Sequence, residues 1–188
     1  MKLDLGCGDR RHDDFVGIDR IPSTATQIVA DITKLPLREG CATEILLDNV
    51  VEHVADIAAL MREVARVADD GARVVVVTPH FTSWASWRDP THLHHLSWFS
   101  MDHFDRGWVA RQVGARLRVT RRRLSFGGGP FGIAGRILFA LSPRAWEKHW
   151  CFVFRASTLR FELVVDKSGS PGRAAQAGQN TRRMETPQ

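Results

Sequence analysis

The sequence predicts an α/β fold: a doubly wound, mostly parallel sheet with a shortened or missing first helix. Three observations support this prediction. An apolar strand at residues 3–5 runs into two glycines, Gly6 and Gly8. Two further short apolar segments, residues 15–19 and 30–32, carry acidic residues where each strand ends. Strand and helix patterns then alternate along the chain, which is typical of sheets that bind ligands at the carboxyl ends of their strands.

The glycine pair follows the first strand, where the backbone can approach a ligand. Glycine lacks a Cβ atom, so it takes positive φ values and permits close contact. The second strand ends in Asp19, whose carboxylate can accept two hydrogen bonds from ribose hydroxyls. We therefore expect a nucleoside-type cofactor across these strand ends. A glycine turn that only closes a strand–helix junction is the structural alternative.

The first crossover is short. Nine residues separate Leu5 from Phe15, whereas a parallel crossover normally takes about a dozen or more. The first helix is therefore expected to be a single turn or absent. Residues 9–14 are expected to form an exposed polar loop near the cofactor.

The next elements are a strand, a helix and a central strand. Residues 44–49 are apolar and end in polar side chains, and residues 56–68 have apolar positions at helical spacing. Asp70 and Gly71 are expected to close that helix, because glycine readily takes positive φ. Residues 73–77 are rich in valine, as expected of a parallel strand covered on both faces.

In the second half of the chain, strands and helices are not predicted to alternate regularly as they do in the first half. We expect a helix at 102–113, strands at 115–124 and 159–165, a flexible break at 126–130, and short helices at 133–141 and 143–150. This gives one domain over residues 1–166, in which residues 126–158 form a helical insertion or cap. Residues 167–188 have almost no apolar side chains and are expected to be a disordered tail.

Composition narrows the class of protein. The chain has 188 residues, of which 44% are hydrophobic and 25% charged, as in ordinary globular domains. We expect no signal peptide, since the chain opens almost directly on a strand. Three cysteines without paired spacing favour a reducing cytoplasm. Net charge is −5 over residues 1–100 and +10 over residues 101–188, so the second half fits either an anionic acceptor or a set of solvated arginines.

Six segments carry a resemblance to a known family. They read LDLGCG, GID, ADI, LDNVVEHV, REVARVADDGARVVVVTP and, at 89–92, DPTH. With these segments the chain resembles the class I S-adenosylmethionine-dependent methyltransferases, in their small bacterial type 11 branch, over about residues 1–105. The resemblance implies a Rossmann-like fold in which the last two strands form an antiparallel edge with a helical insertion between them.

The resemblance also implies a cofactor and its contacts. The cofactor is S-adenosylmethionine, a sulfonium that suits the acidic half of the chain. The implied contacts run from the methionine end through the ribose and adenine to the transferable methyl: Asp4, Gly6, Cys7 and Gly8; then Asp19; then Asp31 and Ile32; then Asp48 and Asn49. A helix cap at Asp19, and solvated strand ends at Asp31 and Asp48, are the structural alternatives. Cys7 also fits as a small space-filling residue.

The acceptor pocket is expected in residues 79–95, which are dense in aromatic and titratable side chains. His80 and His92 are the first candidates for a general base, because imidazole is half-ionised near neutral pH. His53 is a third candidate and fits a structural hydrogen bond equally well. Nearby aromatic rings suit either an aromatic or sugar acceptor or a hydrophobic lid: Trp84, Trp87, Trp98 and Phe99.

The histidine-rich stretch also raises the question of a metal. His80, Asp89 and His92, with His94 or His95, are acceptable ligand types for zinc or non-haem iron. Their spacing matches no metal signature, however, so the sequence leads us to expect no metal site.

The sequence therefore predicts a cytoplasmic enzyme that methylates oxygen or nitrogen of a small-molecule or glycan-type acceptor. One alternative is a cofactor-binding protein of this fold with non-methyl-transfer or metal-assisted chemistry. Another is an RNA-modifying methyltransferase, suggested by a pI of about 9.7. We expect no nucleic-acid partner, because the basic run at 121–123 falls in a strand whose side chains alternate between faces. Residues 131–150 suit contact with a membrane surface, or equally a helical core or cap. The oligomeric state is left open.

Overall fold

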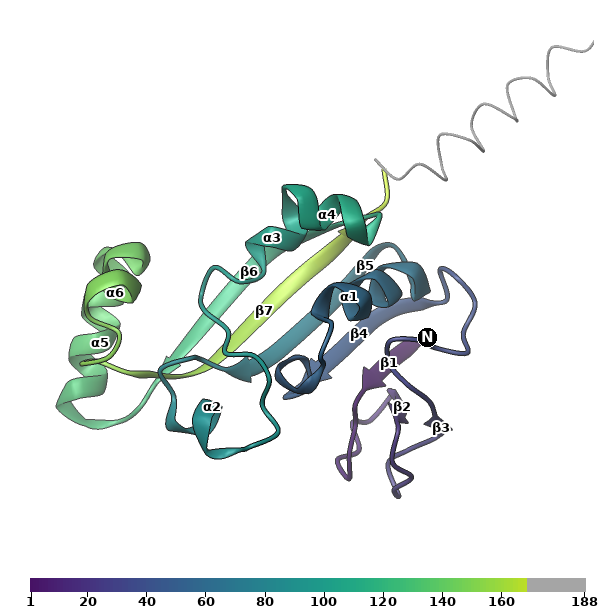
Figure 1. Cartoon of the computed structure of the whole chain (residues 1–188), viewed down its shortest axis with the longest axis horizontal. Coiled ribbons are helices and arrows are strands. Elements are labelled where there is room, and N and C mark those ends of the chain that lie inside the picture. The colour runs from purple at the N-terminus through teal and green to yellow at the C-terminus, as the bar shows by residue number, and fades with distance from the viewer. Residues whose placement is uncertain (169–188) are drawn as a thin grey trace, which may run out of the picture.

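The computed structural model describes residues 1–168 and contains one seven-stranded sheet, ordered β3-β2-β1-β4-β5-β7-β6 (Figure 1). The strands are β1 (Lys2–Leu5), β2 (Val16–Asp19), β3 (Ile28–Val29), β4 (Ala42–Asp48), β5 (Ala68–Pro79), β6 (Arg116–Phe126) and β7 (Ala156–Asp166). The first five strands pair in parallel, and β7 is antiparallel to both β5 and β6. The predicted mixed sheet with an antiparallel last strand is confirmed.

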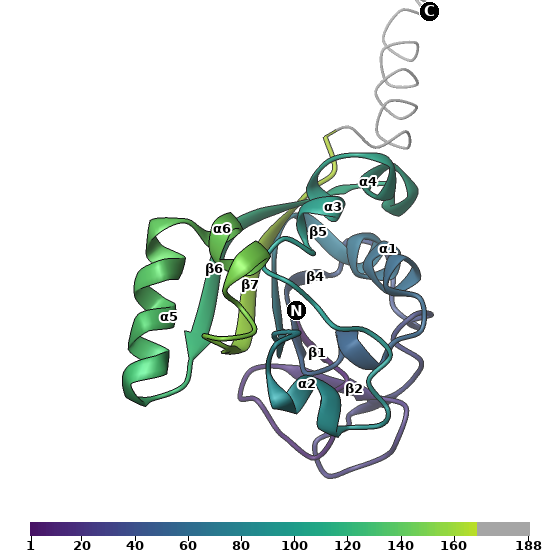
Figure 2. The same cartoon turned by 60° about the vertical axis from the view of Figure 1, so that its left-hand side comes forward.

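Most helices lie in the second half of the chain. They are η1 (Val51–His53), α1 (Ile57–Val67), α2 (Trp84–Arg88), α3 (Asp102–Asp105), α4 (Trp108–Val113), α5 (Gly129–Leu141) and α6 (Pro143–His149). Within residues 1–168, no helix separates β1 from β2, so the prediction of a missing first helix is confirmed. Figure 2 shows α5 and α6 beside the end of the sheet formed by β6 and β7. None of the helices in this described part has the length and hydrophobicity of a transmembrane span.

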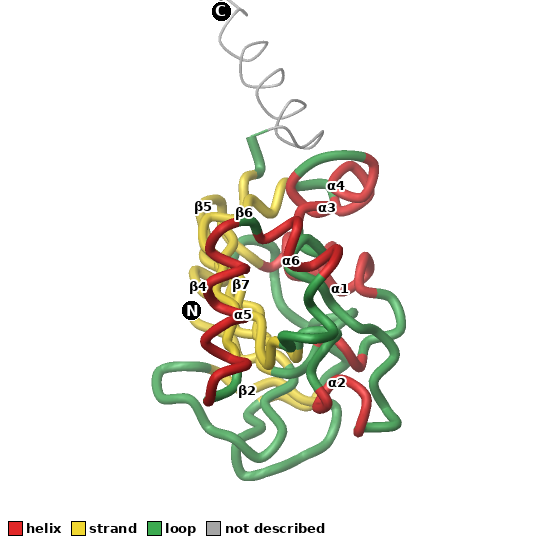
Figure 3. The backbone as a smooth tube through the Cα atoms, turned by 90° about the vertical axis from the view of Figure 1, so that its left-hand side faces the viewer, coloured by secondary structure: helices red, strands yellow, loops and turns green. Residues whose placement is uncertain are grey.

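Helix α1 anchors the core on one face of the sheet. Its N-terminus is capped by Asp56, whose carboxylate accepts a hydrogen bond from Ala59 N at 2.8 Å. The fully buried side chains Leu60, Met61 and Val64 belong to the same apolar cluster as the inward-facing residues of β4 and β5. Helices α3 and α4 lie on this side as well (Figure 3). Burial of this apolar stripe, more than helix propensity, fixes α1.

The opposite face of the central strands carries a ladder of charges. The Arg73 guanidinium contacts Glu44 Oε1 at 2.5 Å and Glu162 Oε2 at 3.1 Å, so it joins β4, β5 and β7. This pairing raises the pKa of Arg73 and lowers the pKa of Glu162. The expectation that β5 is covered on both faces holds for residues 74–76, which are buried, while Val77 is half-buried.

Several boundaries differ from the sequence prediction. The flexible break expected at 126–130 is shorter, because β6 runs to Phe126 and α5 begins at Gly129. Helix α1 ends at Val67 because Ala68 is extended and starts β5 directly, so closure by Asp70 and Gly71 was wrong; Gly71, at φ +80°, lies within β5. Strand β3 ends at Val29 rather than continuing to Ile32. The helix expected over 102–113 is two helices, since Arg106 is extended at φ −139°.

The helical insertion expected at 126–158 contains α5 and α6, which stand between β6 and β7 in the chain. The expected tail begins at Lys167, and its part from residue 169 onward lies outside the described residues. Its disorder stays a prediction.

Candidate functional site

A cavity of about 530 Å³ opens at the carboxyl ends of β1 and β4. Its lining contains six of the nine predicted cofactor contacts together with three residues of the short first crossover: Asp4, Gly6, Cys7, Gly8, Asp9, Arg10, His12, Asp48 and Asn49. The loop expected to lie near the cofactor therefore does line the cavity. The sequence analysis placed that loop but assigned no role to Arg10 or His12.

The glycine loop is shaped by two left-handed residues. Gly6 has φ +75°, and a Cβ atom there would lie 2.6 Å from a methyl carbon of Val50. Gly8 has φ +53° and meets no atom within 4 Å of a Cβ position, so its open side faces the cavity. Gly6 is thus required by packing as well as by backbone conformation, and Gly8 by conformation alone.

Asp19 holds this loop from the end of β2. Its Oδ2 accepts a hydrogen bond from Gly8 N at 2.9 Å, and its Oδ1 accepts one from Ile21 N at 2.8 Å. Each carboxylate oxygen has two lone pairs, so both can still accept a ribose hydroxyl. The residue is therefore placed beside the loop that lines the cavity.

Asp4 is the buried acid of the cavity. It is 2% exposed, and its Oδ2 lies 2.8 Å from His12 Nδ1. Burial raises the pKa of Asp4, outweighing the hydrogen bond from His12, which lowers it. A cationic ammonium group bound here would favour the ionised carboxylate.

Asp48 and Asn49 close the cavity from the end of β4. Asp48 Oδ2 contacts Arg10 at 2.9 Å, and its Oδ1 accepts a hydrogen bond from the Asn49 side chain at 2.7 Å. Asn49 has φ +55°, one of two positive values among the described residues other than glycine. The chain turns sharply here into η1, which begins the side of the molecule where the acceptor is expected.

Asp31 and Ile32 lie beyond the end of β3 and do not line the cavity. Asp31 accepts hydrogen bonds from Thr33 N and Thr33 Oγ1, which lower the pKa of Asp31. Ile32 is half-buried against the core. The structure therefore places these two residues at the neighbouring strand end.

On the acceptor side, His53 and His92 are brought together with a residue that the sequence analysis did not select, Glu52. One ligand atom from each lies within 4.8 Å of the others, and the imidazole centroids are 4.6 Å apart. Glu52 is 1% exposed, and its Oε2 accepts a hydrogen bond from Thr78 Oγ1 at 3.0 Å. Burial raises the pKa of Glu52. The available signal was one acidic residue inside the apolar run at 50–54.

His80 lies elsewhere, fully buried beneath α6. Its Nδ1 accepts a hydrogen bond from Thr82 N at 3.2 Å, so the proton is on Nε2 and is donated to Glu147 Oε1 at 3.1 Å. The same Glu147 oxygen accepts a hydrogen bond from Trp98 N. His80 therefore links the end of β5 to α6, and the structure does not group it with His53 and His92.

Of the remaining members of the metal group considered from sequence, His94 and His95 lie apart from this cluster, whereas Asp89 Oδ2 lies 3.9 Å from His92 Nε2. His94 Nε2 lies 3.3 Å from Ala55 O, and His95 Nδ1 lies 2.8 Å from Ser86 Oγ. Asp89 accepts hydrogen bonds from the backbone and hydroxyl of Thr91. Of that predicted set, only His92 joins the cluster with Glu52 and His53.

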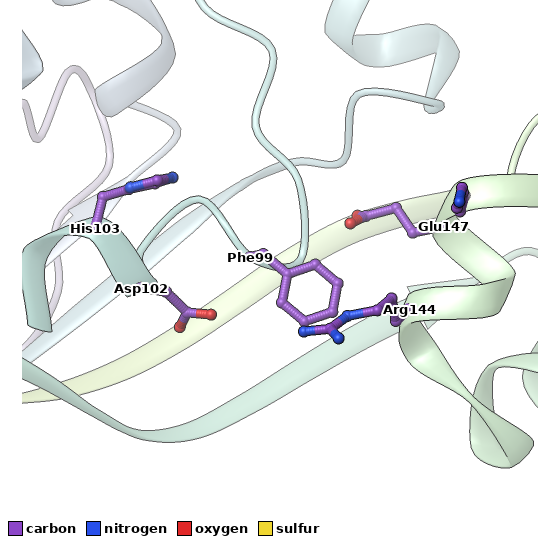
Figure 4. A pocket seen from close by; sticks show the side chains of 6 residues that line it. Phe99, Asp102, His103, Arg144 and Glu147 are labelled. Carbon is purple, nitrogen blue, oxygen red and sulfur yellow. The ribbon is translucent and has the colours of Figure 1, made fainter. Parts of the chain in front are cut away.

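The candidate acceptor aromatics separate into two groups. Trp84 and Trp87 are exposed on α2, with Trp87 stacked on His95 at 3.7 Å. Trp98 packs edge-to-face on Phe139 of α5. Phe99 belongs to a second cavity, of about 480 Å³, lined by Phe99, Asp102, His103, Arg144, Glu147 and Lys148. Figure 4 shows this space between α3 and α6.

Comparisons with known proteins agree with this geometry. Residues 3–76 match the family model described as a methyltransferase domain. No curated protein sequence matches the chain. A methyltransferase dependent on S-adenosylmethionine from Archaeoglobus fulgidus is similar in structure, with a TM-score of 0.57, 14% identity and coverage of 87% of this chain and 85% of that chain.

Two further solved structures are similar. An S-adenosylmethionine-dependent methyltransferase from Mesorhizobium loti has a TM-score of 0.53 and 16% identity, and the match covers 87% of this chain and 89% of that one. The [4+2]-cyclase SpnF has a TM-score of 0.53 and 14% identity, covering 87% and 73%. At these identities the similarity to solved structures shows the fold of this chain. The family match covers residues 3–76, which include the residues that line the cavity at the ends of β1 and β4.

Proposed function

We propose that this chain is a class I S-adenosylmethionine-dependent methyltransferase that methylates oxygen or nitrogen of a small-molecule or glycan-type acceptor in the cytoplasm. The observation that carries the proposal is the cavity at the ends of β1 and β4, where Asp4, the glycine loop and Asp48 surround one space. The three cysteines, all unpaired, support a reducing compartment.

The proposed roles follow from position. S-Adenosylmethionine supplies the sulfonium methyl group. Asp4 binds the cofactor ammonium group, Asp19 the ribose hydroxyls, and the strand end at Asp48 and Asn49 lies towards the methyl group. Methyl transfer is an in-line displacement, so the chain accelerates it mainly by holding the acceptor atom aligned and close. Asp31 and Ile32 are proposed contacts of the adenine from the neighbouring strand end.

The acceptor is proposed to bind between η1 and the loop that carries α2. His53 and His92 lie together there and can accept a proton from a hydroxyl or an amine. The exposed indoles of Trp84 and Trp87 offer flat surfaces of the kind on which sugar or aromatic rings pack. His80 is given a positioning role, because its side chain is fully buried with both nitrogens engaged.

Calorimetric titration with S-adenosylmethionine and S-adenosylhomocysteine tests the cofactor half of this proposal. Transfer of a labelled methyl group to pooled hydroxyl and amine acceptors tests the rest. Cofactor binding without transfer to any acceptor would favour the alternative of other chemistry on this fold, of which the similar [4+2]-cyclase is an example by its name.

A membrane-surface contact is a second proposal, favoured by one specific observation. Helix α5 exposes a stripe of apolar side chains at four-residue spacing, Ile133, Ile137 and Leu141, each more than half exposed. Arg136 of the same helix is an exposed cation, and Arg144 and Lys148 of the following helix α6 are exposed as well. Apolar side chains flanked by cations suit an anionic bilayer or a lipid-linked acceptor.

Nucleic acid is not among the proposed partners. The basic run at 121–123 does not form one patch, because Arg122 turns inward and hydrogen-bonds Trp98 O and the Asp102 carboxylate. Its neighbours in the strand point to the other face.

A further inference from the structure

The side chains of Glu52, His53 and His92 lie together where the acceptor is proposed to bind. The proposed binding of the cofactor gives Glu52 no role. We propose that these three side chains bind a divalent transition-metal ion, such as Zn²⁺ or Fe²⁺. Two imidazoles and one carboxylate are a ligand set that both ions accept, with further coordination positions left for water or substrate.

The burial and the hydrogen bonding of the Glu52 carboxylate indicate that it binds a ligand. It is 1% exposed, and its Oε1 has no hydrogen-bond partner among the described residues. A buried polar atom without a partner is costly, and metal coordination removes that cost. Its other oxygen accepts a hydrogen bond from the fully buried Thr78, which fixes the orientation of the carboxylate.

His53 has its tautomer set by Thr91. The Thr91 hydroxyl donates its proton to Asp89 Oδ1 at 2.7 Å, so towards His53 it can only accept. His53 Nδ1, 2.9 Å from that hydroxyl, must therefore donate. The Nε2 atom of the neutral ring then carries the lone pair that a metal requires.

His92 shows the same arrangement with a different partner. Its Nδ1 lies 2.9 Å from Ser86 O, a carbonyl that can only accept, so Nδ1 carries the proton and Nε2 the lone pair. Each of the three ligands thus has an outer hydrogen bond that orients it, as is usual for metal-binding side chains.

The two segments that supply the ligands are also tied together. Leu93 N and His94 N both donate to Glu52 O, at 2.8 and 3.2 Å, which holds the loop after α2 against η1. One ligand atom from each of the three side chains lies within 4.8 Å of the others. Ligands about 2.1 Å from a metal lie roughly 3–4 Å apart, so side-chain shifts of about 1 Å complete the site.

This inference rests on the proposed function in one respect and changes the role of the two histidines. With a metal bound, their Nε2 atoms coordinate the ion and do not accept the proton of the acceptor. An acceptor hydroxyl bound at an open metal position would lose its proton to water more readily. Its oxygen would then form the new O–C bond as the S–C bond of the cofactor breaks, leaving S-adenosylhomocysteine. The site would therefore select an oxygen acceptor.

Titration of the metal-free protein with Co²⁺ alone tests the site without cofactor or acceptor. Visible absorption bands report Co²⁺ with nitrogen ligands, and competition with Zn²⁺ gives its affinity. We expect His53→Ala, His92→Ala and Glu52→Gln each to weaken Co²⁺ binding at least tenfold. His149→Ala, which removes an exposed histidine of α6, is the matched control and should bind as the wild type does.

Thr91 variants test the positioning argument and guard against misfolding of the ligand variants. Thr91→Val should weaken Co²⁺ binding about tenfold, and Thr91→Ser, which keeps the hydroxyl, should restore it. Absence of Co²⁺ binding by the folded wild type would overturn the proposal, as would unchanged affinity in both histidine variants. S-Adenosylhomocysteine calorimetry on the same samples separates that outcome from failure of the proposed function.

Discussion

The backbone amide of Gly8 donates a hydrogen bond to the Asp19 carboxylate over 2.9 Å, which joins the glycine loop after β1 to the end of β2. The acid proposed to hold the cofactor ribose therefore also fixes the loop that lines the cavity. In the proposed function one side chain would then both bind the ribose and hold the loop. Substitutions at Asp19 should affect both.

We expect Asp19→Ala to weaken S-adenosylhomocysteine binding by about 10- to 100-fold, because hydrogen bonds to a charged group are lost together with the loop contact. Asp19→Asn keeps one acceptor oxygen and should lose less. Calorimetry measures both, with the exposed Asp13→Ala as control. Equal binding by the wild type and Asp19→Ala would show that the ribose lies elsewhere.

Alanine substitutions at Gly6 and Gly8 should destabilise the fold by different amounts. Gly6→Ala combines positive φ with overlap against Val50 and should destabilise the fold by about 2–4 kcal/mol. Gly8→Ala carries only the backbone strain, about 1–2 kcal/mol, and its methyl group enters the cavity. Urea unfolding should therefore rank Gly6→Ala as the less stable variant. Gly8→Ala should bind the cofactor poorly while remaining folded, and the reverse order of stability would contradict the packing seen at Val50.

Because of Asp4, the stability of the unligated protein should fall as pH rises, whereas its affinity for the cofactor should rise. Its folded pKa is raised above the ordinary value of 3.8 by burial, so the folded state holds this proton more tightly than the unfolded state. The unligated protein therefore loses this contribution to stability as pH rises from about that ordinary value through the raised pKa. Affinity for the cofactor ammonium group should rise over the same window, because the carboxylate becomes charged.

Asp4→Asn provides the check. Its unfolding free energy should be flatter across that pH window than in the wild type, and higher above it. Its affinity for S-adenosylhomocysteine should be lower and nearly independent of pH there. Asp13→Asn, at an exposed position in the loop after β1, should leave both profiles unchanged. A wild-type affinity that does not vary with pH would remove Asp4 from the ammonium site.

Substitution of His80 should mainly lower stability, and substitution of His92 should mainly lower kcat. His80→Ala removes a fully buried ring and leaves Glu147 without one partner, which should cost about 2–4 kcal/mol of unfolding free energy. His92→Ala should cost less stability but lower kcat for methyl transfer. Thermal unfolding and kcat measured on the same preparations decide this. A stable His80→Ala enzyme with kcat abolished would return His80 to the role of general base.

The apolar stripe of α5 should control attachment to lipid. Ile137→Asp should abolish co-sedimentation with vesicles that contain anionic lipid, because it places a charge within the exposed stripe. Trp108→Asp on α4, also an exposed apolar residue, is the matched control and should co-sediment as the wild type does. If the wild type stays in solution with anionic and zwitterionic vesicles alike, the stripe has no role at a bilayer surface.

Local patterns in the sequence predicted the succession of strands along the chain and the glycine loop that lines the cavity. The apolar strand, the glycine pair and Asp19 lie within nineteen residues, and short-range backbone rules suffice to interpret them. The missing first helix followed from chain length alone, because nine residues leave no room for a full crossover. The end of α1 was misjudged because strand pairing of Ala68 with Ala42 overrode the local glycine signal.

Only the tertiary structure decided which histidines lie together. His53 and His92 lie 39 positions apart and meet because Glu52 O accepts the amides of the loop after α2, whereas His80 is carried under α6 by Glu147. In the sequence, the three histidines are equivalent candidates for a general base, because each offers the same imidazole group. Burial and hydrogen-bond partners are properties of contacts between distant segments, so they separated a structural imidazole from two that stand beside a buried carboxylate.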